Sequence, residues 1–211
     1  MSARPSIRRV LLKVSGEMFG SAGAGIDLGR VDGFADELKT AHGAGVELAL
    51  VAGGGNILRG AVISGGGSER VDCDYMGMLA TVINALALRG ALERAGVEAV
   101  VMTPFALERA AEKFTRREAL KHLREGRTLL LAGGTGNPFF TTDTAAALRA
   151  LEIGADVLLK GTKVDGIYDR DPKIDPAARR FESITYTDML RDDLRVMDAA
   201  AVALCRDNGL P

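Results

Sequence analysis

The sequence predicts an α/β fold, with a mainly parallel sheet sandwiched between helices. Short apolar runs that are typical of buried strands alternate five times with segments of helical periodicity. Three of these runs lead into glycine-rich turns, and two carry a lysine at or near the end. Strand ends of a parallel sheet meet at one edge, where open α/β sheets bind their ligands. The pattern therefore predicts a ligand site at that edge.

Composition limits the class of protein. The 211 residues fit one domain, and a hydrophobic content of 47% predicts a sizeable core. With 27 basic and 28 acidic residues, the chain gives no sign of a nucleic-acid or membrane partner. Cys73 and Cys205 lack metal-ligand spacing, so we expect free thiols. Residues 1–6 contain no apolar leader, and no apolar run looks long enough to cross a bilayer, so we expect a soluble cytoplasmic protein.

The first strand, residues 10–14, carries Lys13 one residue before its end. A lysine in an apolar strand costs desolvation energy unless an anion meets it, which favours a phosphate contact. The alternative is an edge-strand lysine whose ammonium reaches solvent. Residues 20–25 form either a regulatory flap or a linker. Val31, Phe34, Leu38 and Ala41 then share one face of a helix.

The second strand, residues 46–52, runs into Gly53-Gly54-Gly55-Asn56-Ile57-Leu58-Arg59-Gly60. The planar guanidinium of Arg59 suits a phosphate. A long helix from Arg70 to Leu92 is apolar on more than one face, which indicates a buried position and favours a subunit interface. Asp74, near the start of this helix, either caps it or accepts hydrogen bonds from ligand hydroxyls.

The fourth strand, residues 128–132, precedes the run Gly133-Gly134-Thr135-Gly136-Asn137-Pro138-Phe139-Phe140-Thr141-Thr142-Asp143. A helix follows over residues 144–151, and one of residues 141–143 should be its N-cap. Backbone amides and the positive end of the helix dipole would then form an anion site.

The third strand, which precedes these elements in the chain, covers residues 97–103. The basic segment from Lys113 to Arg127 is expected to be a solvated helix face.

The fifth strand, residues 156–160, again ends in a lysine, Lys160. In the loop that follows, Tyr168 could lie against an adenine ring, and Asp165, Asp169 or Asp171 could hold ribose or a solvated metal. Helices are expected over residues 185–191 and 196–206. The two histidines, His42 and His122, are expected on helix surfaces, where they are poor catalytic candidates.

Phosphoryl transfer is the chemistry that this set of residues predicts. Walker-type and dinucleotide-binding glycine motifs are absent, as are the nucleophile elbow and Cys/His metal patterns. Three glycine loops, two lysines, one arginine and one helix-start carboxylate exceed what one mononucleotide needs. They fit two phosphorylated ligands held in line while charge is neutralised.

The strings Leu12 to Gly16, Gly53 to Gly60, Asp74 to Thr81, Gly133 to Asp143 and Lys160 to Gly166 together resemble the bacterial UMP kinases of the amino-acid kinase family. The match runs from about Arg8 to Leu210. The resemblance implies transfer of a phosphoryl group from ATP to UMP, with Mg²⁺, in pyrimidine nucleotide synthesis. It also implies a homohexamer regulated by GTP.

Site residues follow from the same resemblance, position by position. The implied catalytic residues are Lys13, Asp143, Lys160 and Arg59, with Asp143 holding the two lysines, and no residue is assigned as a metal ligand. The implied ATP contacts are Lys13, Val14, Ser15, Gly16, Gly55, Arg59, Thr162, Tyr168 and Asp171. The implied UMP contacts are Gly54, Asp74, Thr135, Gly136, Asn137, Pro138, Phe139, Phe140, Thr141 and Thr142. The implied activation loop is Ser21, Ala22, Gly23, Ala24, Gly25 and Ile26.

A single domain over residues 1–211 is expected, with residues 1–150 largely on the acceptor side and 151–211 largely on the ATP side. The family continues past Pro211 with a strand and a hairpin, which are expected to be absent here: either the sequence is incomplete or the sheet lacks this edge strand. Two other functions remain open: a kinase of a carboxylate or carbamate on the same fold, and a nucleotide- or oxyanion-binding relative without turnover. The presence of Lys13, Asp143 and Lys160 argues against lost catalysis.

Overall fold

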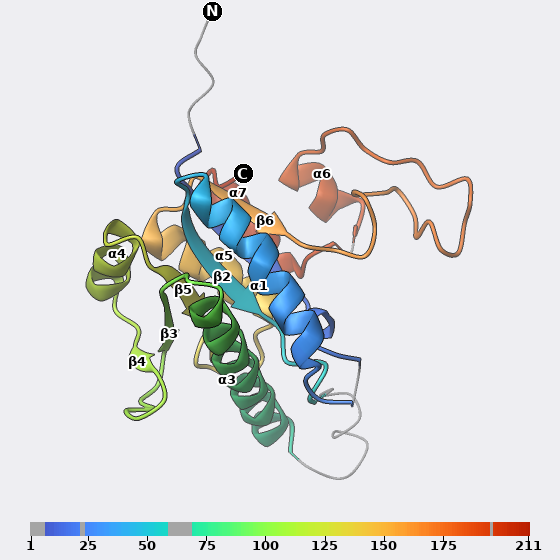
Figure 1. Ribbon diagram of the computed structural model, residues 1–211. Helices are drawn as coiled ribbons and strands as arrows, with labels where there is room; N and C mark the ends of the chain where they lie inside the picture. The colour runs from blue at the N-terminus through green and yellow to red at the C-terminus, as the bar shows by residue number, and fades with distance from the viewer. Residues whose placement is uncertain (1–6, 22–23, 59–68, 195) are drawn as a thin grey trace, which may run out of the picture.

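A six-stranded sheet forms the centre of the protein. The computed structural model describes residues 7–21, 24–58, 69–194 and 196–211. The strand order is β4-β3-β5-β2-β1-β6, and every described strand pair is parallel, as predicted (Figure 1). The strands are β1 (Arg9–Val14), β2 (Glu47–Ala52), β3 (Ala99–Thr103), β4 (Glu112–Lys113), β5 (Thr128–Leu131) and β6 (Val157–Lys160).

Helices cover both faces of this sheet. Helices α1 and α3 lie together on one face, and α4, α5 and α7 pack on the other (Figure 1). The αβα arrangement predicted from the alternating pattern is therefore confirmed. The helices are η1 (Gly16–Met18), α1 (Leu28–Gly43), α3 (Arg70–Arg94), α4 (Arg116–Arg124), α5 (Thr142–Ile153), α6 (Tyr186–Arg191) and α7 (Ala199–Asp207).

Two separate apolar cores result from the alternation of side chains along the central strands. In β2, Leu48 and Leu50 face the α1/α3 side, whereas Ala49 and Val51 face the α5/α7 side. Successive strand residues point to opposite faces of a sheet, so a strand covered on both sides is apolar throughout. This is why the strands appear in the sequence as continuous apolar runs.

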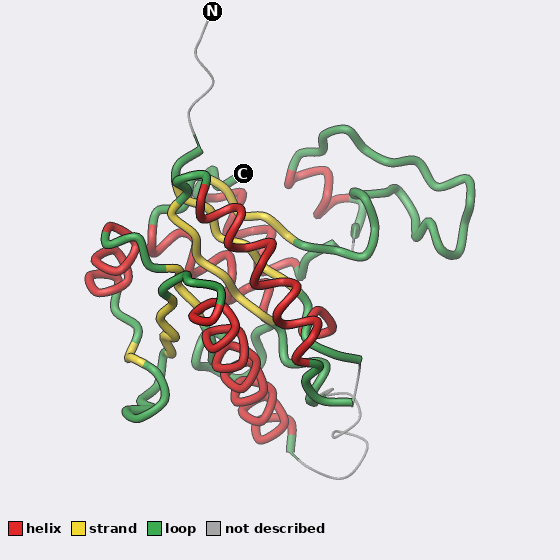
Figure 2. The backbone as a smooth tube through the Cα atoms, in the orientation of Figure 1, coloured by secondary structure: helices red, strands yellow, loops and turns green. Residues whose placement is uncertain are grey.

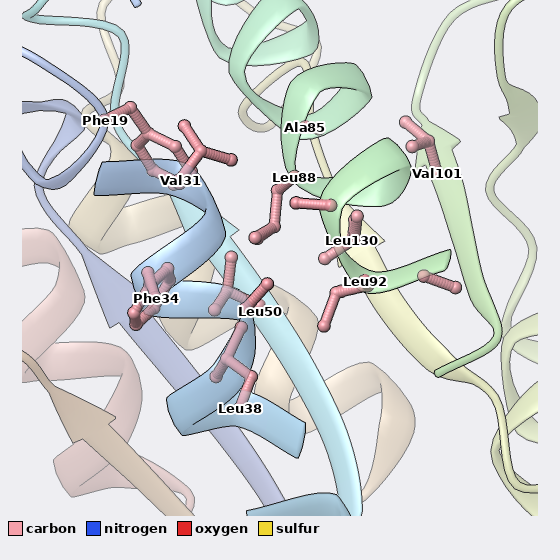
Figure 3. Packing of buried hydrophobic residues seen from close by; sticks show 14 of the residues in the cluster. Phe19, Val31, Phe34, Leu38, Leu50, Ala85, Leu88, Leu92, Val101 and Leu130 are labelled. Atoms are coloured by element: carbon pink, nitrogen blue, oxygen red, sulfur yellow. The ribbon is translucent and has the colours of Figure 1, made fainter. Parts of the chain in front are cut away.

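The core between α1, α3 and the sheet is shown in Figure 3. Phe19 and Phe34 meet edge to face, with ring centroids 6.0 Å apart, while Leu88 and Leu92 of α3 pack toward Leu50 and Leu130 of the sheet. Edge-to-face contact is a favoured geometry for aromatic pairs. The position of α3 on the sheet is therefore set by packing along its length.

Helix α3 also carries an outward apolar face. Tyr75, Met76, Leu79 and Ile83 are each between 43% and 47% exposed. Among the described residues, α3 is the one helix long and apolar enough to span a membrane by length and composition, so the expectation that no run reaches that length was wrong. Half of its most apolar 18-residue window is buried inside the protein, where it packs against α1 and β3.

Two local predictions need correction. The basic segment is not one helix: Lys113 lies in β4, which the sequence did not predict, and α4 is only nine residues long. It begins after Thr115, whose hydroxyl accepts a hydrogen bond from Glu118 N, and it ends before Gly126 at φ 78°. His122 is buried rather than on the surface. Its Nε2 lies 2.9 Å from Glu112 Oε2, and its Nδ1 lies 2.9 Å from Arg127 NH1.

Residues 161–185, between β6 and α6, form a long connection that extends away from the sheet (Figure 2). Its two arms pair across the loop: Asp169 N donates to Arg179 O at 3.0 Å, and Phe181 N donates to Ile167 O at 2.8 Å. These hydrogen bonds hold the two arms together at residues 167–169 and 179–181. Leu158 N of β6, the strand that carries Lys160, donates to Pro211 O at 2.9 Å.

Candidate active site

Two lysines and one aspartate meet at the carboxyl ends of β1 and β6. Lys13 and Lys160 occupy paired positions on these adjacent parallel strands. The Lys13 ammonium lies 2.7 Å from Asp143 Oδ1, and the Lys160 ammonium lies 2.8 Å from Asp143 Oδ2. All three side chains are largely buried, with 12%, 22% and 13% of the side chain exposed for Lys13, Lys160 and Asp143. One carboxylate thus bridges two cations.

Helix α5 places Asp143 at this point. Thr141 is its N-cap, and its hydroxyl accepts hydrogen bonds from Asp143 N and Thr144 N, as expected for one of residues 141–143. Asp143 lies in the first turn, where the helix dipole favours a negative charge. Its Oδ1 accepts no well-directed hydrogen bond from the described residues, so the Lys13 contact is chiefly electrostatic. Lys160 also donates to the Val196 carbonyl.

The glycine turns after β1 and β2 pack against each other without room for side chains. Gly53 N donates to Val14 O at 3.0 Å. A Cβ on Gly16 would lie 2.7 Å from both Gly53 O and Gly55 N, and one on Gly54 would lie 2.8 Å from Ala80 Cβ of α3. The two turns therefore need glycine to lie this close. Ser15 directly follows β1, and its hydroxyl oxygen accepts a hydrogen bond from Glu17 N at 3.3 Å.

A small cavity opens between the β2 turn, α3 and the turn that precedes α5. Its volume is about 170 Å³. Asp74 lies at its side, where Oδ2 accepts a hydrogen bond from Phe139 N at 2.8 Å and lies 3.0 Å from Arg70 Nε. Asp74 is the fifth residue of α3, and the N-cap is Glu69, so Asp74 does not cap the helix. Of the residues predicted to contact UMP, this cavity is lined by Gly54, Asp74, Thr135, Phe140, Thr141 and Thr142.

The turn that precedes α5 folds in the left-handed region at several positions. Gly133, Gly134 and Gly136 have φ of 80°, 61° and 84°, and Phe139 has φ of 71°. Its four other predicted residues, Gly136 to Phe139, are not among those lining the cavity. Phe139 and Phe140 are 65% and 52% exposed, and the Arg70 guanidinium lies 5.6 Å from the Phe139 ring centroid.

A second, larger cavity of about 720 Å³ lies beside Lys160, along residues between 162 and 174, residues 192–194 and Val196. Thr162, Tyr168 and Asp171, predicted to hold ATP, all line it. The Tyr168 hydroxyl donates to Asp165 Oδ1 at 2.7 Å. This hydrogen bond lowers the pKa of Asp165 and raises the pKa of Tyr168. Tyr168 is therefore oriented by Asp165.

Several predicted residues fall elsewhere. Arg59, Ala22 and Gly23 lie outside the described residues. Ser21 O accepts a hydrogen bond from Ala24 N at 3.0 Å, Gly25 N donates to Asn56 O at 3.3 Å, and Ile26 packs against the α1/α3 core. Of the predicted activation loop, Gly25 thus contacts the β2 turn and Ile26 the α1/α3 core.

Asp198, the N-cap of α7, was not predicted. It joins the starts of α5 and α7: it accepts hydrogen bonds from the hydroxyls of Thr141 and Thr144 and from Ala201 N at 3.0 Å. Burial raises its pKa, but these hydrogen bonds outweigh that effect and leave the pKa below its ordinary value. An aspartate directly before an alanine-rich run is an N-cap signal, so the sequence could have identified its position.

Two buried amides, Asn56 and Asn84, and the hydroxyl of Thr81 were also missed. Thr81 donates to Met78 O at 2.6 Å and accepts from Gly133 N at 2.8 Å, so it ties α3 to the turn that precedes α5. Polar residues in the middle of an otherwise apolar helix were the available signal, because a buried polar group needs a partner.

Comparisons with known proteins agree with this geometry. The family model described as "Amino acid kinase family" matches residues 8–211. The chain is 55% identical to the uridylate kinase of Brucella anthropi, over 100% of this chain and 88% of the relative. It superposes on the crystal structure of UMP kinase from Bacillus anthracis with a TM-score of 0.93 and 38% identity, covering 98% of this chain and 86% of that one. For UMP kinase from Ureaplasma parvum, the TM-score is 0.92 at 35% identity, with coverages of 97% and 87%. The chain therefore belongs to the uridylate kinases of the amino acid kinase family.

Proposed function

We propose that the protein transfers the γ-phosphoryl group of ATP to UMP and releases UDP and ADP. The observation that carries this proposal is the contact of Lys13 and Lys160 with the two oxygens of Asp143. Lys160 lines the larger cavity, whereas Thr141 and Thr142, next to Asp143 in sequence, line the smaller one. The cluster thus stands where two ligands, one in each cavity, would bring their phosphates together.

Neutralisation of charge is the chemical task of the two lysines. A transferring phosphoryl group spreads negative charge over its equatorial oxygens, and catalysis depends on positioned cations rather than on covalent chemistry. Lys13 and Lys160 would each donate to those oxygens. Asp143 would hold both ammonium groups in place while the nucleotides bind, and no described residue needs to act as a nucleophile.

The smaller cavity suits the acceptor nucleotide. Its glycine turns present backbone amides to a phosphate, and Asp74 can accept hydrogen bonds from ribose hydroxyls. We assign UMP to this cavity, with the predicted residues from Thr135 to Thr142 around it. Phe139 and Phe140, which are exposed, would then be covered by the bound nucleotide or by its neighbours.

The larger cavity suits ATP, with Thr162, Tyr168 and Asp171 along it and Lys160 at its inner end. Val14, Ser15 and Gly16 are assigned to its phosphates, and Arg59 is proposed to join them. Gly55, also predicted to contact ATP, lines the smaller cavity instead. The described residues contain no group of three or more His, Cys, Asp or Glu side chains placed to hold a metal. Mg²⁺ is proposed to be held mainly by the phosphates of ATP, as is usual for this ion, where it would neutralise phosphate charge.

Residues 1–150 are assigned largely to the acceptor side and residues 151–211 largely to the ATP side of one domain. We propose that the enzyme acts in pyrimidine nucleotide synthesis in the cytoplasm. The outward apolar face of α3, formed by Tyr75, Met76, Leu79 and Ile83, supports a homo-oligomer, proposed to be a hexamer. Residues 21–26 are proposed as part of a site for activation by GTP.

The test is an ADP-release assay with a panel of acceptors: UMP, CMP, aspartate, acetylglutamate and carbamate. Turnover with UMP well above turnover with the others supports the proposal. Turnover with an amino acid but not with UMP would replace it by a carboxylate kinase. Nucleotide binding without ADP release under any of these conditions would indicate a binding protein.

A further inference from the structure

Two fully buried asparagines, Asn56 and Asn84, form a closed pair of hydrogen bonds. Asn56 follows the β2 glycine turn, and Asn84 lies midway along α3; both are 0% exposed. Asn56 Nδ2 donates to Asn84 Oδ1 at 2.9 Å, and Asn84 Nδ2 donates to Asn56 Oδ1 at 2.7 Å. Each amide therefore uses one donor and one acceptor on the other, which fixes the orientation of both.

The second hydrogen of each amide reaches a different loop. Asn84 Nδ2 also donates to Gly53 O at 2.8 Å, and Asn56 Nδ2 also donates to Gly25 O at 3.1 Å. Gly25 N in turn donates to Asn56 O at 3.3 Å. This single amide pair thus joins α3, the β2 glycine turn and Gly25, which precedes α1.

The pair lies beneath the turns assigned to phosphate. A Cβ on Gly16 would approach Asn56 Oδ1 to 2.6 Å, so the β1 turn rests directly on the pair. Gly54 and Gly55, next to the bonded Gly53, line the acceptor cavity. Movement of either amide would therefore shift the backbone amides of both turns.

We propose that Asn56 and Asn84 are positioning residues for phosphoryl transfer. The amide pair holds the β2 glycine turn in the position from which its backbone N–H groups can donate to the acceptor phosphate. This inference rests on the function proposed above. Stability alone does not account for the pair, because two apolar side chains of similar shape can replace a buried hydrogen-bonded pair at little cost. Apolar side chains at these two positions would not hold Gly53 to Gly55 in their observed geometry.

The experiment compares Asn84→Asp with Asn208→Asp, measured for kcat and KM with UMP and with ATP. Aspartate keeps the shape of asparagine, but its ionised form has no hydrogen to donate to Gly53 O or Asn56 Oδ1. Asn208 makes the same kind of side-chain bond, to Leu204 O at 2.9 Å, at the far end of α7. We expect kcat/KM for UMP to fall about 10-fold to 100-fold in Asn84→Asp. Asn208→Asp should remain within about twofold of the parent, since exposed changes usually cost little.

A pH profile separates positioning from loss of folded protein. A protonated carboxyl regains one O–H donor, and burial can move a carboxyl pKa upward by up to 3–5 units. At a temperature where circular dichroism shows both proteins fully folded, the Asn84→Asp to parent ratio of kcat/KM should rise as the pH falls from about 8 to about 6. A flat ratio, or an unchanged kcat/KM, would overturn the inference.

Two further measurements test the inference if Asn84→Asp does not fold. Asn56→Asp keeps the Asn84 bond to Gly53 O, so it should lose less activity than Asn84→Asp; an equal or larger loss counts against the proposal. The parent itself can be labelled with ¹⁵N-asparagine, which gives signals from four side chains only. UMP should shift the NH₂ signals of Asn56 and Asn84 and leave that of Asn208 unchanged. Absence of a shift at the pair would refute the inference, whereas a parent inactive with UMP would refute the proposed function instead.

Discussion

Replacing Asp143 by asparagine removes the charge that both lysines contact. The Lys13 and Lys160 ammonium groups lie 2.7 and 2.8 Å from its two oxygens. At an effective dielectric constant of about 20, each contact corresponds to about 6 kcal/mol of Coulomb attraction before competition from water. The three side chains are 12% to 22% exposed, so water offsets only part of this attraction. In the variant, two cations would face a neutral amide, and their positions would spread.

We expect kcat to fall by about 10²–10³, the usual loss for one preorganised electrostatic partner. The KM for UMP should change much less, because the acceptor cavity is lined by other residues. Steady-state ADP release with UMP as acceptor measures both. Asp36→Asn, on the exposed side of α1, is the matched control and should keep the parent rate. If kcat for Asp143→Asn stays within about threefold of the parent value, the loss is smaller than that expected for one electrostatic partner. The roles assigned to the cluster would then be wrong.

Three other predictions follow from the site. Gly54→Ala places a Cβ 2.8 Å from Ala80 Cβ and should raise the KM for UMP at least about tenfold, because overpacking shifts the turn. The control is Gly33→Ala, where a Cβ meets nothing within 4 Å, and equal KM values for the two variants would contradict the prediction. Asp198→Asn should lower the melting temperature at neutral pH, measured by circular dichroism against Asp207→Asn. Because the pKa of Asp198 is lowered in the folded protein, its ionised form stabilises the fold at pH values above the unfolded pKa of about 3.9. This contribution is lost as the pH falls through the folded pKa, so a difference in melting temperature between variant and parent that persists below that pKa would count against the prediction. Removal of divalent metal by EDTA should abolish ADP release until Mg²⁺ is restored, while the melting temperature without nucleotide stays the same; a lower melting temperature would reveal a metal held by the protein itself.

Much of the architecture was predictable because it depends on patterns that are local in sequence. Continuous apolar runs identified the buried strands, and the glycine turns identified the edge where ligands bind. Lys13 and Lys160 stood out because a cation at the end of an apolar strand needs a partner, and Asp143 stood out at a helix start. Their meeting required that β1 and β6 be parallel neighbours and that α5 begin beside the ends of these strands, as the structure shows.

Polar contacts between separate segments were not predictable in the same way. His122 was expected on a helix surface, but its partners Glu112 and Arg127 lie in β4 and in the turn after α4, and no periodic pattern indicates them. The Asn56–Asn84 pair likewise depends on how α3 is placed on the sheet. The pairing of β4 with β3 was missed because a two-residue strand leaves no periodic signal.

The most direct test of the account is a crystal structure of the protein with UMP and a non-hydrolysable ATP analogue bound together. We expect the ammonium groups of Lys13 and Lys160 each to lie within about 2.7–3.2 Å of oxygens on the phosphoryl group to be transferred, with the Asp143 carboxylate still in contact with both. A complex in which that phosphoryl group lies away from both ammonium groups would contradict it.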